Sequence, residues 1–182
     1  MEFWDIYDEN KKPTGRTMKR NDWCLKDGEY HLTVLGVVAR PDGTFLITKR
    51  VMTKAWAPGW WEVSGGAAQA GEESYEAVLR EVKEETGLTL TSYKFRGLVT
   101  FINSECESEL MCVFTADEYA GELIECDEGE LCWVDKAMVP NLPAWEGDQV
   151  FLDLLLSGEK RFFSVKLRYE GDRLVEKKIH LY

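Results

Sequence analysis

Three glutamates in one short segment are the residues of this sequence best suited to chemistry. Glu81, Glu84 and Glu85 stand at positions i, i+3 and i+4, so on a helix they cluster on one face. Like charges one turn apart repel each other, and a bound cation would offset that repulsion. Hard divalent cations take oxygen ligands and are shared between carboxylates and substrate phosphates. The cluster therefore predicts a Mg²⁺ or Mn²⁺ site for phosphate chemistry, with a solvated helix face as the alternative.

The segment that must position these glutamates runs from residue 66 to residue 88, GAAQAGEESYEAVLREVKEETGL. Gly71 and Glu72 are expected to open a helix, and Gly87 stands where a left-handed C-cap would close it. A glycine-rich loop, SGGAAQAG, precedes the helix and suits a backbone that turns tightly or approaches a ligand. Residues at helical spacing form the predicted apolar face: Tyr75, Val78, Leu79 and Val82.

This segment resembles the Nudix box, GX5EX7REUXEEXGU, where U is a bulky aliphatic residue. It matches every defined position, at Gly66, Glu72, Arg80, Glu81, Val82, Glu84, Glu85, Gly87 and Leu88. The resemblance implies a hydrolase that cleaves a diphosphate linkage with divalent metal ions. It implies metal ligands at Gly66 (through its carbonyl), Glu81, Glu84 and Glu85, with Arg80 beside them in the catalytic centre. Glu72 and Arg80 are then a supporting pair that fixes the metal-binding turn.

A second resemblance covers the N-terminal part. WDIYDENKKPTGRTMKR followed by GEYHLTVLGVV is similar to the isopentenyl-diphosphate-isomerase-like branch of the same superfamily. In true isomerases a catalytic cysteine lies in the strand before the box, and the box is altered. Here that strand, WWEVSGG, has no cysteine and the box is intact, so isomerase activity is disfavoured. His31 aligns approximately with a metal-binding histidine of the isomerases, but a lone histidine on a strand is more often structural.

Further candidates lie outside the box. FLITKR resembles the family strand that often ends in arginine, so Arg50 is a candidate phosphate contact, with Lys49 or Lys54 as alternates. Many family members take another metal ligand or a general base from a late loop, where this chain has Glu128 and Glu130. We retain Glu130 as the late-loop acid.

Tryptophans flank the box loop. Trp61 and Val63 are predicted core residues of the strand that enters the box. Trp56 and Trp60 lie nearer the preceding loop, where either could stack on a base or pack against the domain.

The remaining pattern predicts an α/β fold with strands on both sides of one central helix. Strands are expected at 2–8, 29–40, 45–50, 60–64, 91–103 and 108–117, with a later helix at 147–157. Residues 9–15 read as a turn, 121–130 as an acidic turn region before LCWV, and the tail as a hairpin turning at Gly171-Asp172. This agrees with the Nudix-type α/β/α sandwich, in which a mixed β-sheet lies between helices. We expect one domain over 1–182, with a C-terminal hairpin extension at about 160–182.

Composition narrows the class of protein. The net charge of −11 argues against a nucleic-acid polymer as partner, because such binders carry a basic stripe. No apolar run reaches membrane-spanning length and the first residues do not resemble a signal peptide, so a cytoplasmic protein without membrane contact is expected. The five cysteines form no CxxC and two histidines are too few for a histidine-based zinc centre, so buried free thiols are expected.

The sequence therefore predicts a metal-dependent hydrolase whose substrate is a small phosphorylated molecule, a nucleoside diphosphate linked to another moiety. An isopentenyl-diphosphate isomerase and a non-catalytic Nudix-fold binding module are the alternatives. The apolar alternation of Phe163, Val165, Leu167 and Tyr169 needs a covering surface. We expect the C-terminal hairpin to contribute to a homodimer contact or to shape the substrate pocket.

Overall fold

The computed structural model describes residues 1–54, 57–127 and 129–182; Trp56 and Glu128 lie outside them. Its strands are β1 (Phe3–Tyr7), β2 (Pro13–Lys19), β3 (Tyr30–Val38), β4 (Thr44–Arg50), β5 (Trp61–Glu62), β6 (Ser64–Ala67), β7 (Thr89–Asn103), β8 (Glu109–Ala120), β9 (Gly129–Asp135), β10 (Phe163–Glu170) and β11 (Arg173–Leu181). The α-helices are α1 (Ser74–Thr86) and α2 (Glu146–Leu156), and a 3₁₀ turn covers Val139–Asn141. Within the described part of the chain, neither α-helix is long and apolar enough to cross a membrane.

The strands form two sheets. The large one has the order β11-β10-β7-β8-β3-β1-β2, with β6 paired to β3, and the small one has the order β5-β4-β9. The large sheet is mixed, because β10 pairs with β7 and β3 with β8 in parallel, whereas its other pairs are antiparallel.

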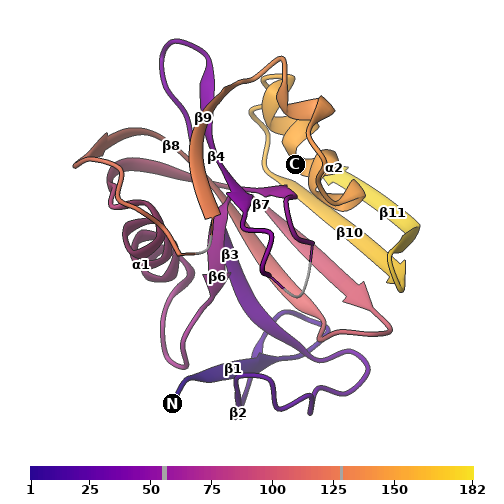
Figure 1. Ribbon diagram of the computed structural model, residues 1–182. Helices are drawn as coiled ribbons and strands as arrows, with labels where there is room; N and C mark the ends of the chain where they lie inside the picture. The colour runs from indigo at the N-terminus through magenta and orange to yellow at the C-terminus, as the bar shows by residue number, and fades with distance from the viewer. Residues whose placement is uncertain (55–56, 128) are drawn as a thin grey trace.

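Two apolar cores lie on opposite faces of the large sheet, as strand alternation requires. Buried α1 residues such as Val78 and Val82 pack in one core, and α2 residues such as Phe151 pack in the other. Figure 1 shows α1 and α2 on opposite sides of the strands. The predicted α/β sandwich with a mixed sheet between helices is thereby confirmed.

Helix α1 begins later than predicted. Gly71, with φ of +80°, and Glu72 belong to the preceding turn, while Glu73 is the N-cap and its backbone N–H donates to Glu76. The predicted apolar face is right at Val78 and Val82, but Tyr75, in the first turn of the helix, is 46% exposed. Gly87 closes the helix with φ of +81°, as expected.

Strand β2 is absent from the predicted elements. The sequence predicts a turn over residues 9–15, but only the start of this segment turns, and Pro13 already begins β2. Its proline, glycine and lysine are poor strand formers, and the strand forms because β1 offers a partner on which Met18 packs opposite Trp4. The predicted strand at 60–64 is divided into β5 of the small sheet and β6 of the large one, and the other predicted elements occur with their ends shifted by a few residues.

The C-terminal hairpin belongs to the large sheet. Phe163, Val165, Leu167 and Tyr169 are at most 2% exposed and join the core beneath α2. The turn falls at Gly171-Asp172 as predicted, and Tyr169 accepts a hydrogen bond from the Gly147 N–H at 2.6 Å. The apolar face of the hairpin is therefore covered by the chain's own second helix.

All five cysteines are free thiols, as expected, but their burial differs from the prediction. Cys112 is buried, Cys126 and Cys132 are half-buried, and Cys24 and Cys106 are exposed. The last two lie in the loops before β3 and β8, which explains their exposure.

Candidate active site

The turn between β6 and α1 brings the predicted catalytic residues together around Arg80. Its Nε and Nη2 donate to both oxygens of Glu72 at 2.9 and 2.8 Å, and its Nη1 donates to Glu81 at 2.6 Å. Nη1 also reaches Glu84 at 3.5 Å, and Nη2 donates to the carbonyl of Ala67 at 3.1 Å. One guanidinium thus joins the loop to three carboxylates.

The charges of this cluster are partly removed from water. The side chains of Glu72, Glu81 and Arg80 are 16%, 15% and 22% exposed, whereas Glu84 is 64% exposed. Burial raises the pKa of Glu81, against the effect of the Arg80 hydrogen bond, and the neighbouring Glu84 adds to the rise. Burial opposes ionisation of Glu72 too, but the hydrogen bonds from Arg80 and from the Gln69 N–H outweigh it and lower the pKa.

Glycines allow the strand before the helix to approach these carboxylates. A Cβ on Gly66 would lie 2.6 Å from the carboxyl group of Glu81, so only glycine leaves the space that Glu81 occupies. The Gly65 N–H donates to Glu85 at 3.2 Å. Two box glutamates therefore touch β6, while Glu84 extends outward.

The box residues supply oxygen ligands, but their side chains are not gathered around one point as in a preformed metal site. No three acidic, histidine or cysteine side chains within 1–54, 57–127 and 129–182 are grouped closely enough to hold a metal ion. Arg80 engages Glu81 and Glu84 instead. The donor set nevertheless fits a hard cation, because Glu81, Glu84, Glu85 and the Gly66 backbone supply only oxygen ligands.

The other predicted phosphate and acid residues lie on the small sheet. Arg50 donates through Nη1 to both oxygens of Glu62 at 2.8 and 2.9 Å. Lys49 lies 5.7 Å from the ring centre of Trp61. Glu130 is exposed on β9, in register with Lys49. The structure thus brings the box residues together, and it places Arg50 and Glu130 on the neighbouring sheet.

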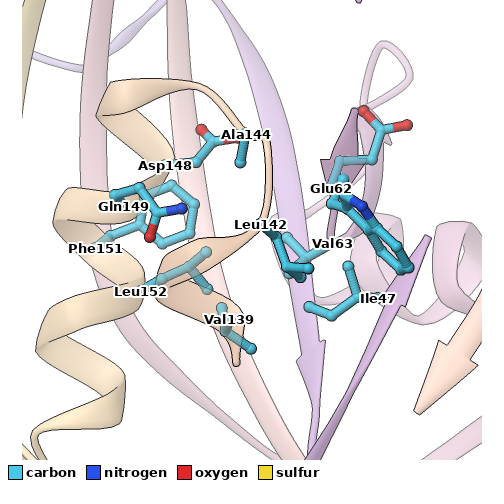
Figure 2. A pocket seen from close by; sticks show the side chains of 11 residues that line it. Ile47, Glu62, Val63, Val139, Leu142, Ala144, Asp148, Gln149, Phe151 and Leu152 are labelled. Carbon is cyan, nitrogen blue, oxygen red and sulfur yellow. The ribbon is translucent and has the colours of Figure 1, made fainter. Parts of the chain in front are cut away.

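A pocket lies between the small sheet and α2 (Figure 2). Its enclosed cavity is only about 10 Å³, about the space for one water molecule, and Glu62, Asp148 and Gln149 supply its polar groups. Most of its lining is apolar, including Ile47, Val63, Val139, Leu142, Phe151 and Leu152. Figure 2 shows Glu62 on the strand side and Asp148 with Gln149 on the helix side.

Two acidic groups, Asp148 in the pocket lining and Glu109 outside it, have raised pKa values. Burial raises the pKa of Asp148 to about 7, and the charges of Glu62 and Glu109 reinforce the rise. Burial likewise raises the pKa of Glu109, at the start of β8, to about 7 against a 3.0 Å hydrogen bond from Thr33. A carboxyl group that is half protonated near neutral pH can donate or accept a hydrogen bond. Within the described residues, the amide oxygen of Gln149 is buried without a hydrogen-bond partner.

Aromatic rings lie near the N-terminal end of α2, the end that carries Asp148 and Gln149. Trp145, the N-cap residue of α2, lies 5.1 Å from Trp60 between ring centres. Val63 is buried as predicted, and Trp61 is only half-buried because it lines the pocket.

His31 has the properties of a structural residue. It is 4% exposed and stacks on Trp4 with ring centres 4.4 Å apart. Burial lowers its pKa to about 4, so the ring is neutral at neutral pH.

Asp148 and Gln149 were missed in the sequence because their role depends on packing far along the chain. An acidic residue in the first turn of a helix is ordinarily explained by its favourable interaction with the helix dipole. The available signal was the segment AWEGDQVF, where polar residues interrupt an otherwise apolar helix directly after a tryptophan.

Comparison with known proteins decides the family. The model of the NUDIX domain family matches residues 29–155, which include the box and α2. The chain belongs to the Nudix family. As a Nudix protein it is a pyrophosphohydrolase, and the predicted resemblance is confirmed.

Two of the relatives of this Nudix protein reported below carry a named activity. It is 34% identical to the oxidized purine nucleoside triphosphate hydrolase of Danio rerio over 81% of this chain and 93% of that protein. It is 32% identical to the isopentenyl-diphosphate delta-isomerase of Escherichia coli over 70% of this chain and 73% of that protein, in agreement with the N-terminal resemblance. An uncharacterized Nudix hydrolase of Bacillus subtilis, YvcI, is 38% identical over 56% of this chain and 67% of its own length.

The fold of this Nudix hydrolase also has solved counterparts. The MutT protein of Bacillus halodurans superposes with a TM-score of 0.73 at 27% identity, over 81% of this chain and 96% of that chain. The Nudix domain of Shewanella oneidensis NrtR, solved with ADP-ribose, superposes with a TM-score of 0.58 at 17% identity and shows the same fold.

Proposed function

We propose that this Nudix hydrolase cleaves the diphosphate linkage of a nucleoside diphosphate derivative with the help of Mg²⁺ or Mn²⁺. The observation that carries the proposal is the packing of Glu81 against Gly66, with Glu84 and Glu85 on the same helix. With Glu72 included, three carboxylates (Glu72, Glu81 and Glu84) share the single guanidinium of Arg80, which leaves a local excess of two negative charges. A divalent cation and a polyphosphate substrate together would balance that excess.

Gly66, Glu81, Glu84 and Glu85 would hold the metal, and Glu72 would keep Arg80 and the loop in position. When bound, such an ion stabilises charge on the phosphate oxygens and lowers the pKa of bound water. Arg80 would turn from Glu81 and Glu84 while keeping its two hydrogen bonds to Glu72. A glutamate of the box, or Glu130, would accept the proton from the attacking water.

Arg50 is proposed to contact a substrate phosphate, with Lys49 or Lys54 as alternates. Arg50 lies at the end of β4 beside Glu62, and Glu62 stands four residues before Gly66. Four residues of extended chain span at most about 13 Å. A nucleotide whose base lies at the mouth of the pocket could therefore extend its phosphates toward the box.

We propose a purine nucleoside triphosphate as the substrate to test first. The pocket combines apolar walls with Glu62, Asp148 and Gln149, which together can accept and donate hydrogen bonds along the edge of a base. The zebrafish relative bears the name of an oxidized purine nucleoside triphosphate hydrolase. The products would be a nucleoside monophosphate and pyrophosphate.

The experiment is a hydrolysis screen of purified protein with Mg²⁺ or Mn²⁺. Substrates are oxidized and unmodified purine and pyrimidine nucleoside triphosphates, ADP-ribose, nucleotide sugars, dinucleoside polyphosphates and coenzyme A. Glu85→Gln should lower turnover by several orders of magnitude, whereas Glu118→Gln, on the exposed end of β8, should not. Activity that survives thorough chelation would refute the metal-dependent mechanism.

The same screen tests the alternatives. Isopentenyl diphosphate is included as a substrate because of the isomerase relatives. Formation of dimethylallyl diphosphate would favour the hypothesis that the protein is an isomerase. Nucleotide binding without turnover of any substrate would favour a binding module.

A further inference from the structure

The N-terminal strand runs beside the box loop and makes two hydrogen bonds to it. The Oδ2 atom of Asp5 accepts a hydrogen bond from the Gly71 N–H at 2.7 Å. The carbonyl of Phe3 accepts a second one from the Ala70 N–H at 2.8 Å. Both acceptors belong to β1, more than sixty residues before the loop and outside the segment that the family model matches.

Strand β1 is a firm support for these contacts. Trp4, Ile6 and Met18 are 6%, 1% and 2% exposed and form a small core between β1 and β2. Ala67, at the end of β6, packs against this core. Because side chains alternate along a strand, Asp5 points away from Trp4 and Ile6. Its carboxylate is thus presented to the loop by a strand that is itself anchored.

The loop needs such support because its central residues are exposed. Ala70 and Gly71 are exposed, and Gly71 has φ of +80°. The next residue, Glu72, receives the hydrogen bonds from Arg80, and Arg80 in turn bonds the Ala67 carbonyl. Arg80 therefore holds the two ends of the loop from the helix side, and Asp5 with Phe3 holds its tip from the opposite side.

We propose that Asp5 is a positioning residue that fixes the 66–72 loop in the conformation required for metal binding. It acts through the Gly71 N–H and does not touch the substrate or the metal. The inference depends on the proposed function only for what the loop binds. Without Asp5 the loop would keep its Arg80 contacts but would sample other conformations at Ala70 and Gly71.

The test uses the full-length protein with three single substitutions. Asp5→Ala removes the acceptor, while Asp5→Asn keeps an acceptor oxygen and removes the charge. Asp8→Ala is the matched control, since Asp8 accepts hydrogen bonds from Asn10 and Lys12 in the same hairpin without reaching the loop. Mn²⁺ binding is measured by electron paramagnetic resonance of the free ion, and loop opening by hydrogen exchange of peptides that contain residues 66–72.

Asp5→Ala should weaken Mn²⁺ binding by about 3- to 10-fold, the range expected for one lost hydrogen bond. Exchange in the loop should accelerate in the same variant. Asp5→Asn should stay within about twofold of the wild-type affinity, because the amide oxygen can still accept the bond. Asp8→Ala should leave both readouts unchanged even if it lowers thermal stability.

Equal weakening in Asp5→Ala and Asp5→Asn would overturn the inference, since the charge of Asp5 would then matter and not its hydrogen bond. Unchanged loop exchange in Asp5→Ala would overturn it too. If the wild-type protein binds no Mn²⁺, the proposed function fails, and loop exchange then decides separately whether Asp5 positions the loop.

Discussion

Replacement of Asp148 by asparagine should change how the stability of the protein depends on pH. The pKa of Asp148 is raised from 3.8 to about 7, first by burial and then by the charges of Glu62 and Glu109. Because the folded state binds a proton that the unfolded state has released, the free energy of unfolding falls as pH rises from about 4 to about 7. The loss of stability that comes from ionising Asp148 in the folded state is complete above about pH 7. It is absent below about pH 4.

The size of the effect follows from the same values. The interval from 3.8 to about 7 corresponds to about 4 kcal/mol at 1.36 kcal/mol per pH unit, as an upper bound. Residual solvent screening at this half-buried side chain reduces it to about 2 kcal/mol. Slightly more than half of this loss of unfolding free energy, about 1 kcal/mol, should occur between pH 5 and pH 8.

Urea unfolding of wild type and Asp148→Asn at about pH 5 and about pH 8 measures this difference. The asparagine variant should gain about 1 kcal/mol relative to wild type on going to the higher pH. Glu146→Gln is the control, because Glu146 lies in the same helical turn with an exposed side chain. Glu109→Gln should reduce this loss of stability, since the charge of Glu109 contributes to the raised pKa of Asp148. The same pH dependence in wild type and Asp148→Asn would refute the reasoning.

Four further results are expected. Glu85→Gln should lower turnover by several orders of magnitude with little loss of stability, as measured by steady-state kinetics and thermal unfolding. Arg80→Ala should lower both, with a loss of about 2–4 kcal/mol because Glu72 and Glu81 lose their partner. Gly66→Ala should weaken Mn²⁺ binding, since its methyl group would meet the Glu81 carboxyl group. Light scattering should give a mass near 20.9 kDa if the C-terminal hairpin shapes the pocket alone, and twice that if it also forms a homodimer.

Each of these expectations has an opposing result. Near-normal turnover in Glu85→Gln would mean that the glutamate cluster is a solvated helix face. An Arg80→Ala protein of wild-type stability would show that the carboxylates reorganise freely without the guanidinium. Unchanged Mn²⁺ affinity in Gly66→Ala would place the metal away from β6. Loss of activity without a change of mass, after substitutions on the outer edge of β11, would favour the pocket role over the homodimer.

The sequence allowed prediction of those parts of the site that are local. Arg80 and Glu72 are eight residues apart, so helix geometry and a short turn suffice to bring them together. Gly87 could be predicted as the end of the helix because a left-handed C-cap strongly favours glycine. The box and its internal contacts were therefore accessible without a structure.

The contacts that escaped prediction are those between distant segments. Asp148 becomes a pocket residue only because α2 packs across the sheet onto β10, and Asp5 reaches Gly71 only because β1 pairs beside β3. Strand β2 likewise depends on β1 and not on its own residue preferences. Local patterns carry no information about such pairings.

The parallel pairing of β10 with β7 has a consequence for the order in which the molecule can assemble. Phe163 lies in register with Gly97, so this contact closes a loop of more than sixty residues. Loop closure of this kind is entropically costly and slows folding. During synthesis, the segment from β3 to β8, with α1, leaves the ribosome before α2 and β10 exist. Helix α1 can therefore dock early, whereas the pocket beside α2 must wait until α2 and β10, on which it packs, have been made.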